Sequence, residues 1–274
     1  MLEKKIIDVW MQHPTLRHSN HPMFDSLKRW TKQPKRVTEE LPLAMTIAAM
    51  DAAGVNKGLI CSWQNAQEVL ISNEEVAGFV AQYPDRFIGI ASAPMHQPVK
   101  AVKELKHWVN NHGFKGLRIV QWLWNLPPTH PYYYPLYVAC VELDIPICLQ
   151  VGHTGPLMPS EVGRPIPYID QIALDFPDLR IVCGHIGYPW TTEMIAVATK
   201  HENVYIDTSA YTAKRYPIEL VQYMKSHGQN KVLFGTNYPM ITAQKCLANL
   251  DDLGLSENVK AKFLYQNAMN IFNL

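Results

Sequence analysis

Polar residues lie at the ends of several apolar runs of this sequence. Their side chains are of the types that carry acid–base chemistry or bind substrate oxygens. A histidine can act as a general base or acid, while amides and arginine can hold a carbonyl or carboxylate oxygen. A folded core gains nothing from such groups at its rim unless they meet a ligand or each other. The recurrence therefore predicts a functional site. Its candidate residues are Asp8, Trp10, Gln12, His13, Arg118, Gln150, His153, His185, Asp207 and Asn237.

The elements that must position these residues are eight short, β-rich apolar runs that alternate with helical patterns. Helices are expected within 39–54, 99–113 and 216–228, and several of these segments end in glycine, which accepts the left-handed backbone that terminates a helix. Strands are expected at 5–11, 57–63, 87–94, 115–120, 146–152, 179–186, 203–210 and 231–239.

Eight strand–helix units in 274 residues are typical of a (β/α)₈ TIM barrel, here one α/β domain over residues 1–274. A doubly wound open sheet would favour a glycine-rich turn after an early strand, and none occurs. Two long connections, 12–38 and 153–167, follow the first and fifth strands. In a barrel they would lie over the C-terminal mouth, where such enzymes bind substrate.

Composition restricts the partners and the compartment. Lys and Arg total 25 against 24 Asp and Glu, and no basic run is interleaved with aromatic residues, so neither nucleic acid nor an anionic membrane is expected as a partner. The five cysteines are scattered without a C-x-x-C pair, which favours buried, reduced thiols. With no signal-peptide core and no apolar stretch of 18 residues, we expect a cytoplasmic protein acting on a small molecule.

Three segments resemble the amidohydrolase superfamily, specifically the branch that contains aminocarboxymuconate-semialdehyde decarboxylase and aromatic-acid decarboxylases. They are "CGHIGYPWTTEMIAVATKHENVYIDTSAY" (183–211), "KVLFGTNYP" (231–239) and "QVGHTGP" (150–156). The first looks like the family's strand-six "GHxGxPW" segment, and the second like its last-strand "FGTDYP". The resemblance runs the whole length of the chain and implies a TIM barrel, a homodimer and either hydrolysis or decarboxylation.

The resemblance also implies a divalent metal, held by H-x-H on strand one, a histidine on strand five and an aspartate on strand eight. Trp10 and Gln12 occupy the H-x-H positions, and Asn237 occupies the aspartate position. Either Gln150 or His153 takes the strand-five place, and His185 alone matches without qualification. An indole NH cannot ligate and neutral amides are poor zinc ligands. We therefore expect a site without a metal. Zinc or manganese on His153 and His185 is the alternative.

The remaining roles follow from residue chemistry, each with a structural alternative. His185, His153 and Asn237 are the predicted catalytic residues, although His185 could be a satisfied core histidine and Asn237 a turn residue. Arg118 either clamps a substrate carboxylate or pairs with Asp8 or Asp207. The predicted substrate-binding residues are Trp10, Gln12, His13, Arg118, Gln150, Trp122 and Asp207; Trp124 and Tyr132 to Tyr134 are further aromatic candidates for a flat substrate.

Without a metal, water activation would depend on a histidine base and neutral oxyanion donors, which suits an activated bond. The leading prediction is thus a hydrolase of a lactone- or ester-like substrate that is aromatic or bears a carboxylate. Decarboxylation of an aromatic or unsaturated acid, a carbon–carbon lyase reaction, is the second. A ligand-binding barrel that has lost catalysis is the third. The polar rim argues against it, because an abandoned site could fill with apolar residues.

Overall fold

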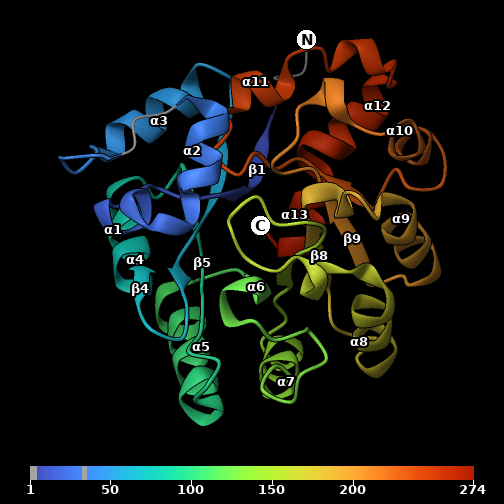
Figure 1. Cartoon of the computed structure of the whole chain (residues 1–274). Coiled ribbons are helices and arrows are strands. Elements are labelled where there is room, and N and C mark those ends of the chain that lie inside the picture. Colours follow the sequence, from blue (N-terminus) through green and yellow to red (C-terminus); the bar gives the residue numbers. More distant parts are fainter. Residues whose placement is uncertain (1–4, 33–35) are drawn as a thin grey trace.

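Eight parallel strands form the centre of the molecule in the order that the sequence predicts (Figure 1). The computed structural model describes residues 5–32 and 36–274. The barrel strands are β1 (Ile7–Met11), β2 (Lys57–Cys61), β5 (Phe87–Ile90), β6 (Leu117–Ile119), β7 (Ile147–Gln150), β8 (Ile181–Gly184), β9 (Val204–Asp207) and β10 (Val232–Leu233). Each lies within a predicted run, and each is shorter than predicted.

Backbone pairing closes these strands into a barrel. One set runs β1–β2–β5 and the other runs β6–β7–β8–β9–β10, each pair in parallel register. Parallel bridges between Met11 and Tyr238 and between Ala91 and Leu117 join the two sets. The circuit therefore has no open edge, which confirms the TIM barrel and excludes the doubly wound sheet.

Helices surround the strands (Figure 1). The predicted segments correspond to α3 (Leu43–Asp51), α5 (Pro98–His112, which begins one residue before the predicted start) and α10 (Ile218–Lys225), and α5 is capped by Gly113 with a φ of 68°. No helix in the described ranges has the length and apolar character needed to cross a bilayer. The other helices are α1 (Leu16–Asn20), α2 (Asp25–Thr31), α4 (Asn73–Gln82), α6 (Gln121–Trp124), α7 (Tyr134–Glu142), α8 (Asp170–Asp175), α9 (Thr191–Lys200), α11 (Ala243–Leu247), α12 (Glu257–Ala261) and α13 (Asn267–Phe272).

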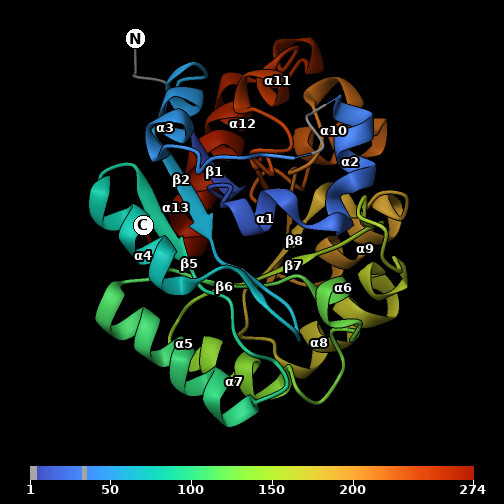
Figure 2. The ribbon, with the colours of Figure 1, turned by 60° about the vertical axis from the view of Figure 1, so that its left-hand side comes forward.

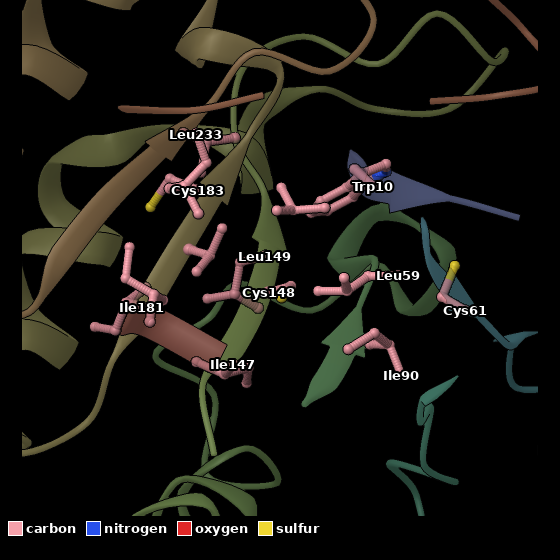
Figure 3. Packing of buried hydrophobic residues seen from close by; sticks show 14 of the residues in the cluster. Trp10, Leu59, Cys61, Ile90, Ile147, Cys148, Leu149, Ile181, Cys183 and Leu233 are labelled. Carbon is pink, nitrogen blue, oxygen red and sulfur yellow. The ribbon is translucent and has the colours of Figure 1, made fainter. Parts of the chain in front are cut away.

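Inward-facing side chains of the strands fill the barrel (Figure 3). Leu59, Ile147, Leu149 and Ile181 are fully buried there. All five cysteines are buried and free, in agreement with the prediction of buried thiols. The wall has room for the indole of Trp10 because β8 ends in glycine: a Cβ at Gly184 would lie 2.6 Å from the Trp10 ring.

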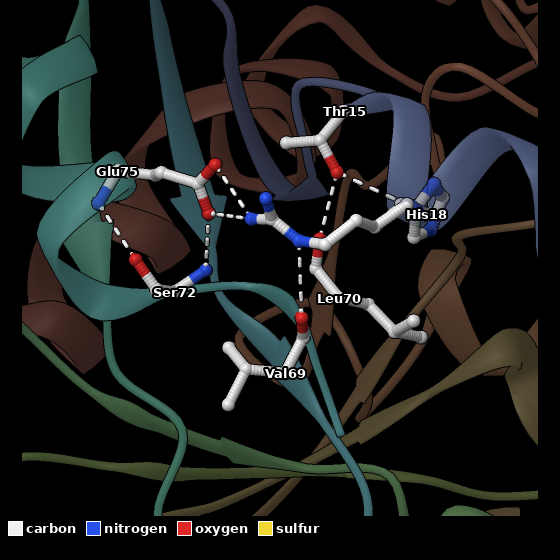
Figure 4. Close-up of polar contacts among 7 residues, drawn as sticks. Thr15, His18, Val69, Leu70, Ser72 and Glu75 are labelled. Carbon is white, nitrogen blue, oxygen red and sulfur yellow. Dashed lines mark hydrogen bonds and ion pairs between the residues drawn. The ribbon is translucent and has the colours of Figure 1, made fainter.

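Both long connections lie over the C-terminal mouth, as predicted, except that residues 33–35 of the first are outside the described part. The first connection carries α1 and α2 across the strand ends (Figure 2). Its Thr15 hydroxyl donates to Leu70 O at 2.7 Å, and Arg17 pairs with Glu75 at 2.5 Å (Figure 4). The Ser26 hydroxyl donates to Gly155 O at 2.7 Å, which fastens this connection to the second one.

An antiparallel hairpin of β3 (Trp63–Gln64) and β4 (Val69–Ile71) was not predicted. Its strands have two and three residues, too few to show a period of two. The hairpin matters for function because it continues from the end of β2 and turns Trp63 toward the mouth.

Candidate active site

A cavity of about 470 Å³ opens at the C-terminal mouth. Six predicted site residues line it: Gln12, Trp122, Gln150, His153, His185 and Asn237. The remaining wall comes from the two long connections and the segments that follow β2, β9 and β10. These lining residues are Phe24, Leu27, Trp30, Thr31, Trp63, Gly155, Pro156, Ala210, Tyr211, Arg215, Met240 and Ile241.

His185 follows β8 directly, and its backbone has a φ of +73°. Its Nδ1 lies 2.7 Å from Ser209 Oγ, and its Nε2 lies 3.5 Å from the side-chain nitrogen of Asn237. Burial, together with the smaller effect of the positive charge of Arg118, lowers the pKa of His185 to about 3. At neutral pH this imidazole is therefore uncharged, and one of its two ring nitrogens bears a lone pair.

Two amides and an indole form a hydrogen-bonded row beside His185. Trp63 Nε1 donates to Gln12 Oε1 at 3.2 Å, and Gln12 Nε2 donates to Asn237 Oδ1 at 3.3 Å. Gln12 and Asn237 are thus held at the positions that the resemblance assigned to a histidine and an aspartate. Gln150 also lines the cavity, and its side-chain amide has no hydrogen-bond partner within the described ranges. It is available to a ligand oxygen.

Four predicted substrate-binding residues are not on the cavity wall. His13 uses both ring nitrogens elsewhere, with Thr46 Oγ1 at 2.8 Å and Leu41 O at 2.9 Å. Trp10 is 1% exposed and lies edge-on to His185, with 5.3 Å between ring centroids. Arg118 and Asp207 are buried in the barrel interior.

Arg118 does not form the ion pair with Asp8 or Asp207 that was one of its two predicted contacts, within the described residues. Its guanidinium stacks on the Trp10 ring at 3.9 Å from the centroid, and it donates to Cys61 Sγ and to Val9 O. Among the residues that the structure describes, no carboxylate forms an ion pair with it. Burial raises the pKa of Asp8 to about 6 and that of Asp207 to about 7, against the smaller lowering effect of this buried cation.

The aromatic wall differs in part from the one predicted. Trp122 lines the cavity together with Phe24, Trp63 and Tyr211. Trp124 instead packs against His96, with ring centroids 5.2 Å apart. Tyr132 to Tyr134 also lie away from the cavity: they precede or begin α7, where the Tyr133 hydroxyl donates to Leu126 O and the Tyr134 hydroxyl to Asp175.

Arg215 is a cavity residue that the sequence reasoning missed. It is exposed, forms no ion pair within the described ranges, and lies beside Tyr211, whose pKa burial raises and the Arg215 charge lowers. The local sequence "TAKRYP" resembles an ordinary solvated turn, so only the closure of the barrel reveals this cation at the mouth. It gives the cavity a free binding partner for an anion.

The residues at the family's metal position do not fit a metal. No group of three or more His, Cys, Asp or Glu side chains that could hold an ion occurs in the described part of the chain. Trp10 has only an N–H donor, and the oxygens of Gln12 and Asn237 already accept hydrogen bonds from neighbours.

The chain is similar to known proteins over nearly its full length. It is 24% identical to gamma-resorcylate decarboxylase of Polaromonas sp., over 87% of this chain and 86% of that protein. A 2-keto-4-carboxy-3-hexenedioate hydratase of Sphingobium sp. is 29% identical over 43% of this chain and 41% of its own.

Solved structures show the same barrel. An uncharacterised TIM-barrel protein from Bordetella bronchiseptica superposes with a TM-score of 0.83 at 25% identity and covers 98% of both chains. A manganese-bound 5-carboxyvanillate decarboxylase from Novosphingobium aromaticivorans has a TM-score of 0.76 at 20% identity, over 98% of this chain and 97% of that one. The amidohydrolase family model matches residues 13–274. The chain belongs to the amidohydrolase family.

Proposed function

We propose that this protein is a decarboxylase of a flat aromatic or unsaturated carboxylic acid. The observation that carries the proposal is the joint presence of Arg215, His185 and an aromatic wall in one cavity of about 470 Å³. A planar ring suits the wall of Trp63, Trp122 and Tyr211, and a carboxylate suits the unpaired guanidinium. The similarity to decarboxylases supports this reaction over the hydrolysis that the sequence alone favoured.

The reaction breaks the bond between the carboxyl carbon and the ring or chain carbon. Its electron pair stays on that carbon, carbon dioxide leaves, and the carbon takes up one proton. His185 is the proton donor in this proposal. Burial keeps it neutral in the empty cavity, and an anion placed against Nε2 raises its pKa, so that substrate binding brings a proton onto the imidazole.

The other polar groups bind and orient the substrate. Arg215 attracts the carboxylate and fixes which end of the ring enters first. Gln150 and the amide row of Gln12 and Asn237 bind a hydroxyl or carbonyl oxygen on the ring, where charge develops as the carbon–carbon bond breaks. No step in this scheme requires a metal ion.

Hydrolysis of a lactone or ester is the second candidate, and the neutral state of His185 favours it. A lone pair on Nε2 can accept a proton from water directly, and the amides beside it can donate to an oxyanion. In this reaction His185 does not need to take up a proton when the substrate binds.

A panel of carboxyl-labelled hydroxybenzoates and a panel of aryl lactones and esters separate these reactions. We expect labelled carbon dioxide from at least one hydroxybenzoate, and its loss in His185→Ala. Turnover of a lactone or ester without carbon dioxide would overturn the proposal in favour of hydrolysis. Binding of these acids without turnover of any substrate would overturn it in favour of a ligand-binding barrel.

A further inference from the structure

A continuous chain of hydrogen bonds connects five side chains around the mouth. It runs from the hairpin after β2, across the ends of β1, β10 and β8, to the segment after β9. In order its members are Trp63, Gln12, Asn237, His185 and Ser209. Ser209 is fully buried and does not line the cavity.

The direction of this chain is determined at its first member. An indole N–H can only donate, so Gln12 Oε1 must be the acceptor at 3.2 Å. Cys61 Sγ lies 3.7 Å from the same oxygen and supports the assignment as a weak donor. Gln12 must then present its NH₂ group to Asn237, whose oxygen accepts at 3.3 Å.

The same reasoning determines the protonation of His185. With its oxygen turned to Gln12, Asn237 presents its NH₂ group to Nε2, which must bear the lone pair. In a neutral imidazole the proton is then on Nδ1, and it is donated to Ser209 Oγ at 2.7 Å. The backbone N–H of Ser209 donates to Asp207 Oδ1 at 2.6 Å, which fixes the place of this residue beside His185.

We propose that Ser209 and Trp63 are positioning residues, which hold His185 from opposite ends of this chain as the Nδ1–H tautomer with the Nε2 lone pair toward the cavity. The hydrogen bond from Asn237 to His185 Nε2 is the weakest of the chain, because it is 3.5 Å long, whereas the contact between His185 Nδ1 and Ser209 Oγ is 2.7 Å long. A substrate can therefore displace the amide from Nε2 without disturbing Nδ1. The catalytic value of this arrangement rests on the proposed function, but the tautomer itself does not.

Nitrogen-15 NMR of histidine-labelled protein tests the tautomer directly, with His185→Gln identifying the signals. We expect a protonated Nδ1 and an unprotonated Nε2 at neutral pH. Trp63→Phe removes the donor that sets the direction and should produce a mixture of tautomers. Trp122→Phe is the matched control, since its indole also lines the cavity but its Nε1 has no hydrogen-bond partner among the residues that the structure describes. In this variant the His185 shifts should be unchanged. A wild-type Nε2–H tautomer, or equal shifts in the two tryptophan variants, overturns the proposal.

Kinetics test Ser209 separately. Ser209→Ala should lower kcat about tenfold, as expected for about 1.4 kcal/mol of lost orientation, with KM unchanged because the hydroxyl is outside the cavity. Ser209→Thr, which keeps the hydroxyl, should recover most of the loss. Wild-type kcat in the alanine variant, or a loss in KM alone, contradicts a positioning role. If the NMR result holds but no carbon dioxide is released, the proposed function fails and the tautomer stands.

Discussion

Replacing His18 with leucine should make the protein more resistant to acid. His18 is fully buried in α1, packed between Phe24 and Trp63 at ring-centroid distances of 4.7 and 5.1 Å. Neither of its ring nitrogens has a hydrogen-bond partner in the described structure. An apolar side chain of similar size therefore removes no hydrogen bond.

The magnitude follows from the pKa of this residue. Burial lowers the pKa of His18 from 6.5 to about 3. Between these two pH values the unfolded chain therefore binds a proton at His18 that the folded chain does not bind. Proton binding to the unfolded chain therefore costs no stability above pH 6.5, and the cost grows as the pH falls from 6.5 toward 3. Each pH unit costs about 1.4 kcal/mol, so about 3 kcal/mol is lost by pH 4.

Urea unfolding at a series of pH values measures this difference. We expect wild type and His18→Leu to have similar free energies of unfolding above pH 7 and to diverge by about 3 kcal/mol at pH 4, with the variant more stable. Other buried groups, such as His185 and Asp8, titrate alike in both proteins and cancel. His107→Leu, at an exposed histidine, is the control and should run parallel to wild type. Parallel curves for His18→Leu would refute the reasoning.

Three further predictions concern the cavity and its walls. Arg215→Gln should raise KM about tenfold for a carboxylate substrate and leave kcat nearly unchanged. Lys214→Gln, at the neighbouring exposed position, should change neither constant in the same steady-state assay, and equal effects of the two variants would show that Arg215 does not bind the substrate. Gly184→Ala should cost about 1–3 kcal/mol in urea unfolding, because its Cβ would lie 2.6 Å from Trp10, and a neutral result would show that the indole can move. Ser26→Ala removes the hydrogen bond between the two connections over the mouth and should speed limited proteolysis of both connections. The free energy of unfolding should change by only about 1 kcal/mol. An unchanged rate of cleavage would show that this hydrogen bond does not hold the connections together.

Most of the fold was predictable because the strands are the strongest local signal. Continuous apolar runs indicated all eight barrel strands and their order, and the polar groups at their ends indicated where the site lies. The misassigned residues show the limit of that reasoning. Gln12 and His13 both follow the end of β1, yet Gln12 lines the cavity while His13 hydrogen-bonds to Thr46.

The residues that were missed have no local signal. Trp63 enters the site through a hairpin too short to predict, and Arg215 lies on a turn that reads as surface. Ser209 acquires its place from the pairing of β9 with β8, which sets it beside His185. Arg118 was recognised as a buried cation, but its partner proved to be the Trp10 ring, a contact that depends on closure of the barrel.

Release of labelled carbon dioxide by chelator-treated protein is the most direct test of the central claim. The protein would be dialysed against a strong chelator, its metal content measured, and carboxyl-labelled hydroxybenzoates supplied with and without added manganese. We expect labelled carbon dioxide at the same rate in both conditions and none from His185→Ala. Release that disappears with the metal and returns with manganese, or no release at all, would contradict the account.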